Sequence, residues 1–106
     1  MTWKPASVEW VHAHLREELG RLPSAHRREL EGLLVDPYSI PVESHPGESV
    51  VVVAEVRDQV LYWSDIEDGW ELAPLTPAGG ISERGSSQLE LGYVARQLFE
   101  ADGRDE

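Results

Sequence analysis

Residues 50–72 read VVVVAEVRDQVLYWSDIEDGWEL, and this stretch decides the fold class. The run at 50–56 is apolar at almost every position, which predicts a central β-strand with both faces at least partly covered. Turns at 57–59 and 65–69 each lead into a shorter run of apolar and aromatic residues. The stretch therefore predicts three consecutive antiparallel strands.

A fourth strand is predicted just before this stretch. Residues 38–43 alternate between apolar and polar side chains, and residues 45–48, HPGE, form a turn. Pro41 lies inside the alternating run and has no N–H to donate to a ladder, so this strand is expected at an edge of the sheet. Together the four runs predict a meander of about four antiparallel strands.

Two helices are predicted on the N-terminal side of the sheet. With Ser7 as N-cap, apolar residues recur every three or four positions along one face of the first helix. These residues are Val8, Val11, Leu15, Leu19 and Leu22. A second, shorter helix is expected between Ser24, as its cap, and Pro37, which closes it. Its apolar face holds Leu30, Leu33 and Leu34 together with His26.

A third helix is predicted near the C-terminus. Ser87 and Glu90 have the spacing of a capping box, and an apolar helical face follows them. That face consists of Leu91, Val94, Ala95, Leu98 and Phe99. Residues from about 101 onward form a charged tail. The elements predict a single α+β domain over residues 1–106, with helices on one face of the sheet and the other face available.

The charge of the chain is divided unequally along its length. The net charge is −11, with five acids and five bases in residues 1–35 but nine acids and one base, Arg57, in residues 36–72. Such a field repels phosphate backbones, so we expect no direct nucleic-acid binding. The absence of cysteine excludes disulfides and thiolate metal sites. No apolar run approaches the ~18 residues of a membrane span or the pattern of a secretory signal, so we expect neither.

The acidic turn and the histidines carry the side chains that could ligate a metal ion or act in catalysis. The turn at 65–69 contains three carboxylates, but its glycine and its twelfth position do not fit an EF-hand loop. Asp68-Gly69 instead predicts a tight hairpin. His12 and His14 lie two residues apart on a helix and point about 200° apart, which excludes a shared zinc ion. With no nucleophile motif or phosphate loop, the sequence predicts no metal, no cofactor and no enzyme activity.

The acidic stretch also carries aromatic residues. Tyr62 and Trp63 are adjacent on a predicted strand, so one should enter the core while the other stands on the outer face. For Trp70 we expect a place in the core. An exposed aromatic ringed by acids suits a basic protein partner. The predicted partner-binding residues are Glu55, Asp58, Tyr62, Trp63, Asp65, Glu67, Asp68 and Glu71.

The segment at 60–72 is a strand with an acid-rich turn that ends in Gly69-Trp70, and a glycine-containing loop and an apolar helix follow it. This pattern, over about the last half of the chain, resembles small acidic immunity proteins of bacterial polymorphic toxin systems. The resemblance implies a non-enzymatic cytoplasmic inhibitor that blocks a basic toxin, and no site residues are carried over from it. Two alternatives stay open. One is a small ligand-binding or enzymatic domain with a pocket between the sheet and residues 76–86, and the other is a homodimeric structural module that uses the free sheet face.

Overall fold

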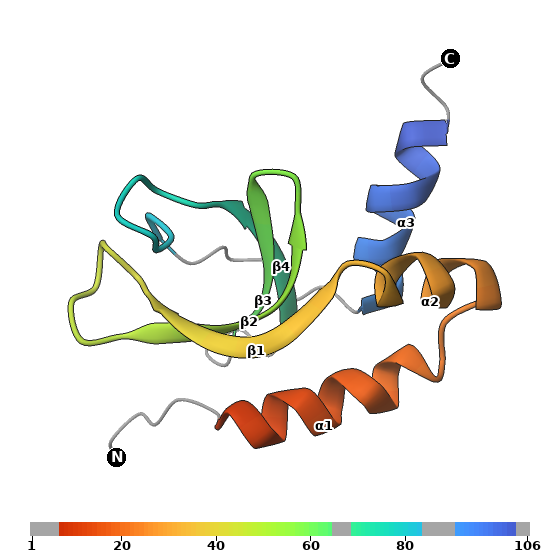
Figure 1. The fold of residues 1–106 in the computed structure, drawn as a ribbon, viewed down its shortest axis with the longest axis horizontal. Coiled ribbons are helices and arrows are strands. Elements are labelled where there is room, and N and C mark those ends of the chain that lie inside the picture. Colours follow the sequence, from red (N-terminus) through yellow and green to blue (C-terminus); the bar gives the residue numbers. More distant parts are fainter. Residues whose placement is uncertain (1–6, 65–68, 84–90, 104–106) are drawn as a thin grey trace.

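The computed structural model of the chain describes residues 7–64, 69–83 and 91–103, with side chains up to residue 98. Helices α1 and α2 come first, a four-stranded antiparallel sheet follows, and helix α3 comes last (Figure 1). The strands lie in the order β1-β2-β3-β4, so the sheet is a simple meander. The elements are α1 Val8–Leu19, α2 Ser24–Glu31, β1 Leu34–Pro41, β2 Ser49–Val56, β3 Gln59–Ser64, β4 Gly69–Pro74 and α3 Leu91–Gly103. The predicted α+β class and element order are confirmed.

Helix α1 begins and packs as its sequence predicts. The Ser7 hydroxyl oxygen accepts a hydrogen bond from the Trp10 N–H at 3.0 Å, which satisfies one of the free donors at the helix start. Val11, Leu15 and Leu19 are buried on the face towards the sheet. Burial of each such side chain contributes roughly 1.5–3 kcal/mol, so this face holds the helix on the sheet.

The second helix is shorter than predicted. It ends at Glu31, and Leu33 and Leu34 leave it, because the chain turns at Gly32 and Leu34 already pairs with Ala54 of β2. Pro37, expected to close a helix, lies within β1. It falls where the register shifts between Leu34 and Tyr38, so no regular ladder bond is required there. As predicted, β1 is an edge strand.

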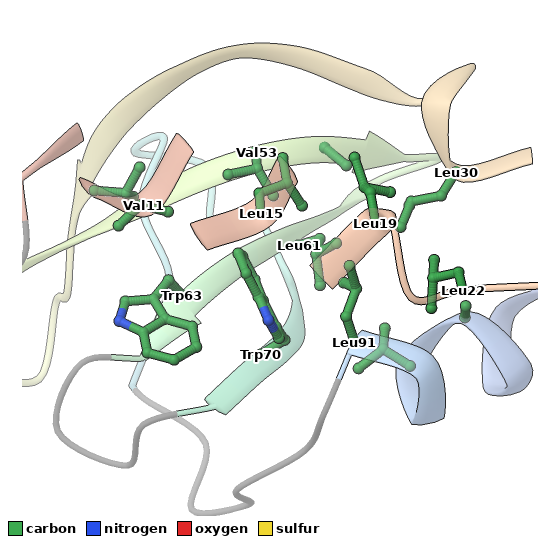
Figure 2. Packing of buried hydrophobic residues seen from close by; sticks show 14 residues of the cluster. Val11, Leu15, Leu19, Leu22, Leu30, Val53, Leu61, Trp63, Trp70 and Leu91 are labelled. Carbon is green, nitrogen blue, oxygen red and sulfur yellow. The ribbon is translucent and has the colours of Figure 1, made fainter. Parts of the chain in front are cut away.

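The central strand β2 is buried on both faces, as its valine run predicts. Val52 and Val53 are fully buried, and a register shift between Val52 and Ala54 accommodates the extra residue. Val53 packs in the core under the helices (Figure 2), where α1 side chains point towards Leu61, Trp63 and Trp70. This helix-side core also takes Leu22, Leu30 and Leu91 from the two other helices and their connections. It joins all three helices to one face of the sheet.

The opposite face of the sheet is covered, which corrects the expectation that it stays available. Its side chains form a second core with one residue from beyond β4, Ile81, which is fully buried. The Ile81 N–H donates to the Pro41 carbonyl at 3.1 Å, and the Glu43 N–H donates to the Ile81 carbonyl at 2.9 Å. The segment after β4 therefore folds back over the curved sheet. The second core consists of Ile40, Val42, Val50, Val52, Val60, Tyr62 and Ile81.

A glycine permits this close approach. A Cβ atom at Gly80 would lie 2.5 Å from the Pro41 carbonyl oxygen, closer than real Cβ contacts. Gly79, one residue earlier, has φ = +89°, a conformation that other residues rarely adopt. The Gly79-Gly80 pair thus allows the chain to turn and lie against β1.

Three further expectations have different outcomes. The turn at 45–48 is present, with hydrogen bonds from the His45 N–H to Val42 and from the Glu48 N–H to His45. The predicted capping box of Ser87 and Glu90 lies outside the described residues. Among the helices that the structure describes, none is long and apolar enough to cross a membrane.

Candidate functional site

The two adjacent aromatics of β3 are both buried, so the expected exposed aromatic is not found at either position. Tyr62 is 0% exposed and Trp63 is 6% exposed. They do point to opposite faces, since Tyr62 belongs to the second core and Trp63 to the helix-side core. The prediction of exposure was wrong because it assumed that one face of the sheet is open. Trp70 is fully buried, as expected.

The structure describes three of the predicted acidic residues, namely Glu55, Asp58 and Glu71. Glu55 and Asp58 are exposed at the end of β2 and in the turn after it. Glu71 is only 8% exposed and lies opposite Tyr62 in the register of β3 and β4, so it does not belong to an exposed rim. Asp65, Glu67 and Asp68 lie outside the described residues. Of the described acids predicted to bind a partner, Glu55 and Asp58 are those that reach solvent.

Glu55 is held by a tyrosine of the neighbouring strand. The Tyr38 hydroxyl donates a hydrogen bond to Glu55 Oε2 at 2.8 Å. Burial raises the pKa of Tyr38 to about 12, with further contributions from the hydrogen bond and the charge of Glu55. The tyrosine is therefore a neutral donor at physiological pH and orients the Glu55 carboxylate at the surface.

Asp58 lines a groove that the sequence did not indicate. This half-open groove, with a cavity volume of about 650 Å³, lies between α2, the β2–β3 turn, β4 and α3. Apolar side chains from the connection after α2, from β2, from β4 and from α3 line it, namely Leu33, Val56, Leu72 and Leu98. Its polar lining residues are Glu29, Arg57, Asp58, Gln59 and Gln97. The volume is in the range of ligand pockets in proteins, and two of the three charged lining residues are acids.

Among the described residues, the exposed edges and turns of the sheet carry an excess of acids, and we call them the acidic sheet surface. Among residues 36–64 and 69–83, six acids are exposed or half-buried, against one base, Arg57. They are Asp36, Glu43, Glu48, Glu55, Asp58 and Glu83. The N–H groups of Glu43 and Ser44 donate to the carbonyls of Ile81 and Ser82, which places Glu43 and Glu83 at the same end of the sheet. The Thr76 hydroxyl also donates to the Glu43 carboxylate. By contrast, the described helices α1 and α2 mix both signs of charge.

An aromatic cluster between α1 and the sheet was also missed from the sequence. His14 stacks on Trp10 with a ring separation of 4.9 Å and on Trp70 at 6.0 Å, and its edge contacts Trp63 at 4.8 Å. Trp10 is 48% exposed and forms the outer end of this stack. The spacing of Trp10 and His14, four residues apart on a helix, is the signal that could have indicated the contact.

Glu18 connects this cluster to the third helix. His14 Nε2 lies 2.5 Å from Glu18 Oε2, a pairing of residues four positions apart on one helical face. The other oxygen, Oε1, accepts a hydrogen bond from the N–H of Leu91, the first residue of α3, at 3.2 Å. The pair therefore has a structural role at the junction of α1 and α3.

Side chains that could ligate a metal ion are dispersed over the described residues. Within them, no three His, Asp or Glu side chains are grouped so that they could hold a metal ion. In the same part of the chain, Ser64 Oγ and Trp70 Nε1 are buried without a hydrogen-bond partner. They belong to opposite faces of the sheet by strand alternation, so they form no common polar site. Three surface features of the described residues could contact a partner, namely the acidic sheet surface, the groove and the exposed Trp10.

Comparisons with known proteins found no relative of this chain. No family model, no curated protein and no solved structure matches the chain.

Proposed function

We propose that this chain is a non-enzymatic binding protein that uses the acidic surface of its sheet to capture a basic protein partner, as a cytoplasmic immunity protein captures a toxin. One observation carries the proposal, namely the six solvent-reaching acids against one base over the described sheet residues. A surface of one sign steers an oppositely charged partner and raises the association rate. Helices α1 and α2 together hold five acids and three bases, which is a smaller excess of negative charge.

The rest of the surface is consistent with this role. Two features, the groove beside Asp58 and the half-exposed Trp10, offer contact area that charge alone does not supply. Tryptophan side chains are frequent anchors at protein interfaces, where packing governs dissociation more than association. The negative charge would set the association rate of the partner, and these contacts would set its dissociation rate.

The alternatives have less support. A pocket between the sheet and residues 76–86 was one of them, but Ile81 packs there against Val42 and the second core. The homodimer alternative relied on an uncovered sheet face, and the second core covers that face. The groove lined by Asp58 has the volume of a ligand pocket, and this volume is the observation that supports a ligand-binding role.

Affinity capture with the tagged chain in its source organism tests the proposal. We expect a basic protein that is released when salt is raised, because salt screens charge pairs over a Debye length of about 8–10 Å. The discriminating variants remove the same number of charges from two places. One variant replaces Glu43, Glu55 and Glu83 of the sheet surface by Gln, and its control replaces Glu9, Glu17 and Glu31 of the helices by Gln.

The association rate with the captured partner separates the outcomes. The sheet variant should slow association by about tenfold at low salt, whereas the helix control should change it by less than about twofold. Equal effects of the two variants would show that only net charge matters and that the sheet surface is not the recognition site. Capture of no basic protein would contradict the proposal altogether.

A further inference from the structure

We infer that the groove between α2 and the β2–β3 turn receives an arginine side chain of the basic partner. This inference rests on the proposed function, because it specifies how the acidic surface holds a cation after the encounter. The groove brings together an acid of the helical part, Glu29, and an acid of the sheet part, Asp58. These residues are 29 positions apart in the chain, and the fold alone makes them neighbours in one lining.

The apolar lining suits the stem of a long cationic side chain. Leu33, Leu72 and Leu98 come from the connection after α2, from β4 and from α3, and each is half-buried. An arginine carries three methylene groups between its backbone and its guanidinium, and such stems pack on apolar surface while the charged end stays in contact with water. The half-open shape of the groove allows this arrangement.

The polar lining suits the guanidinium. Glu29 and Asp58 carry acceptor oxygens on exposed side chains, and the side-chain amides of Gln59 and Gln97 offer further acceptors. Arginine presents five donors in one plane. Its guanidinium is more weakly hydrated than an ammonium ion, so removing water from it costs less free energy. Several acceptors distributed around one groove therefore fit arginine better than lysine.

One lining residue opposes the bound cation. Arg57 is the single base among the described lining residues, and it precedes Asp58 in the β2–β3 turn. Its charge lowers the affinity for a second guanidinium, and the two carboxylates exceed it by one negative charge. Removing the charge of Arg57 should therefore strengthen arginine binding, whereas removing the charge of the neighbouring Asp58 should weaken it.

The test is an NMR titration of the full chain labelled with nitrogen-15. The probes are two capped tripeptides, Gly-arginine-Gly and Gly-citrulline-Gly, which differ in charge but hardly in shape. We expect the arginine peptide to shift the amide signals of Leu33, Asp58 and Gln59, and the citrulline peptide to leave them in place. Equal shifts with both peptides, or shifts confined to Glu43 and Glu83 at the other end of the sheet, would overturn the inference.

Matched variants test whether the carboxylates of the groove hold the arginine peptide. Replacing Glu29 by Gln and Asp58 by Asn in one variant should lower the affinity for the arginine peptide by about fivefold or more, since each exposed charge pair contributes modestly. The control, Gln at both Glu9 and Glu17, removes the same charge from exposed positions of α1 and should change the affinity by less than about twofold. Arg57→Gln should tighten binding by about twofold. A double variant that binds like wild type would also overturn the inference.

The groove inference and the proposed function can be disproved separately. If the captured basic protein binds the Glu29 and Asp58 double variant as tightly as wild type, the groove inference is wrong while the acidic binding surface stands. If no basic protein is captured but the arginine peptide still binds the groove, the proposed partner is wrong while the groove stands as a guanidinium site.

Discussion

The two faces of the sheet are both buried, but different kinds of sequence bury them. The helix-side face is covered by α1, α2 and α3, whose leucines and valines recur with helical spacing. Within the described residues, the second face packs against Val42, just beyond β1, and Ile81, an apolar residue that follows two glycines. Periodic patterns therefore reveal the first kind of cover. The second kind depends on where one residue of an irregular segment comes to lie.

The largest expected effect tests whether the second face is a true core. Val52→Asp places a carboxylate at a fully buried position of that face. Burying an unpaired charge costs several kcal/mol, against a total stability of roughly 5–15 kcal/mol for a domain of this kind. We expect loss of the folded state by circular dichroism. Ser39→Asp, at an exposed position of β1, is the control and should leave the thermal midpoint nearly unchanged.

The next effect compares the two faces directly. Ile81→Ala should cost about 2–4 kcal/mol in the free energy of unfolding, close to the cost of Leu15→Ala on the helix side, because both residues are almost fully buried. Urea denaturation of the two variants measures both values. A cost below about 0.5 kcal/mol for Ile81→Ala would mean that the segment after β4 does not close the second face in solution.

A smaller effect is expected at the glycine that lets this segment approach β1. In Gly80→Ala, the added Cβ would meet the Pro41 carbonyl oxygen at 2.5 Å, so the backbone must shift. We expect a loss of about 1–3 kcal/mol, as for other overpacked sites. Gly20→Ala adds a methyl group where the nearest atom would be 3.5 Å away, and it should cost little. Similar stabilities for the two variants would contradict the close approach.

The smallest effect concerns the polar edge of the second face. Tyr38 ionises near 10 in an unfolded chain, whereas its pKa in the folded chain is raised to about 12. Between these values the folded state binds more protons, so stability should fall as the pH rises from about 10 to 12. Tyr38→Phe should weaken this fall, and Tyr93→Phe, at an exposed position of α3, should not. Urea denaturation of both variants at about pH 8 and pH 11 measures the slopes, and identical slopes would disprove the raised pKa.

Local sequence was a good guide to the separate elements. Ser7 and the leucine spacing predicted α1, the valine run predicted the buried central strand, and Pro41 predicted the edge strand. Each of these signals acts between residues that are close in sequence, through capping, side-chain alternation or a missing donor. The second helix was predicted too long, because Leu33 and Leu34 fit a helical face as well as they fit the pairing of Leu34 with Ala54.

The candidate site was predicted only in part for the same physical reason. The acidic character of the sheet and the exposure of Asp58 follow from composition and from the turn. The groove does not, since it needs Glu29 of α2 beside Asp58, and Glu29 belongs to the part of the chain with balanced charge. Trp10 is a candidate anchor because its ring remains 48% exposed at the outer end of the stack with His14, and that exposure depends on how α1 packs on the sheet.

By itself, the sequence determined the class of the fold, the order of its elements and the negative field of its sheet. These properties depend on hydrophobic periodicity, turn residues and summed charge, which act locally or without regard to exact position. Tertiary structure alone decided that Ile81 closes the second face, that Tyr62 and Trp63 are both buried, and that Glu29 and Asp58 share a groove. Such outcomes depend on contacts between residues far apart in the chain, and no local pattern encodes which distant segments will meet.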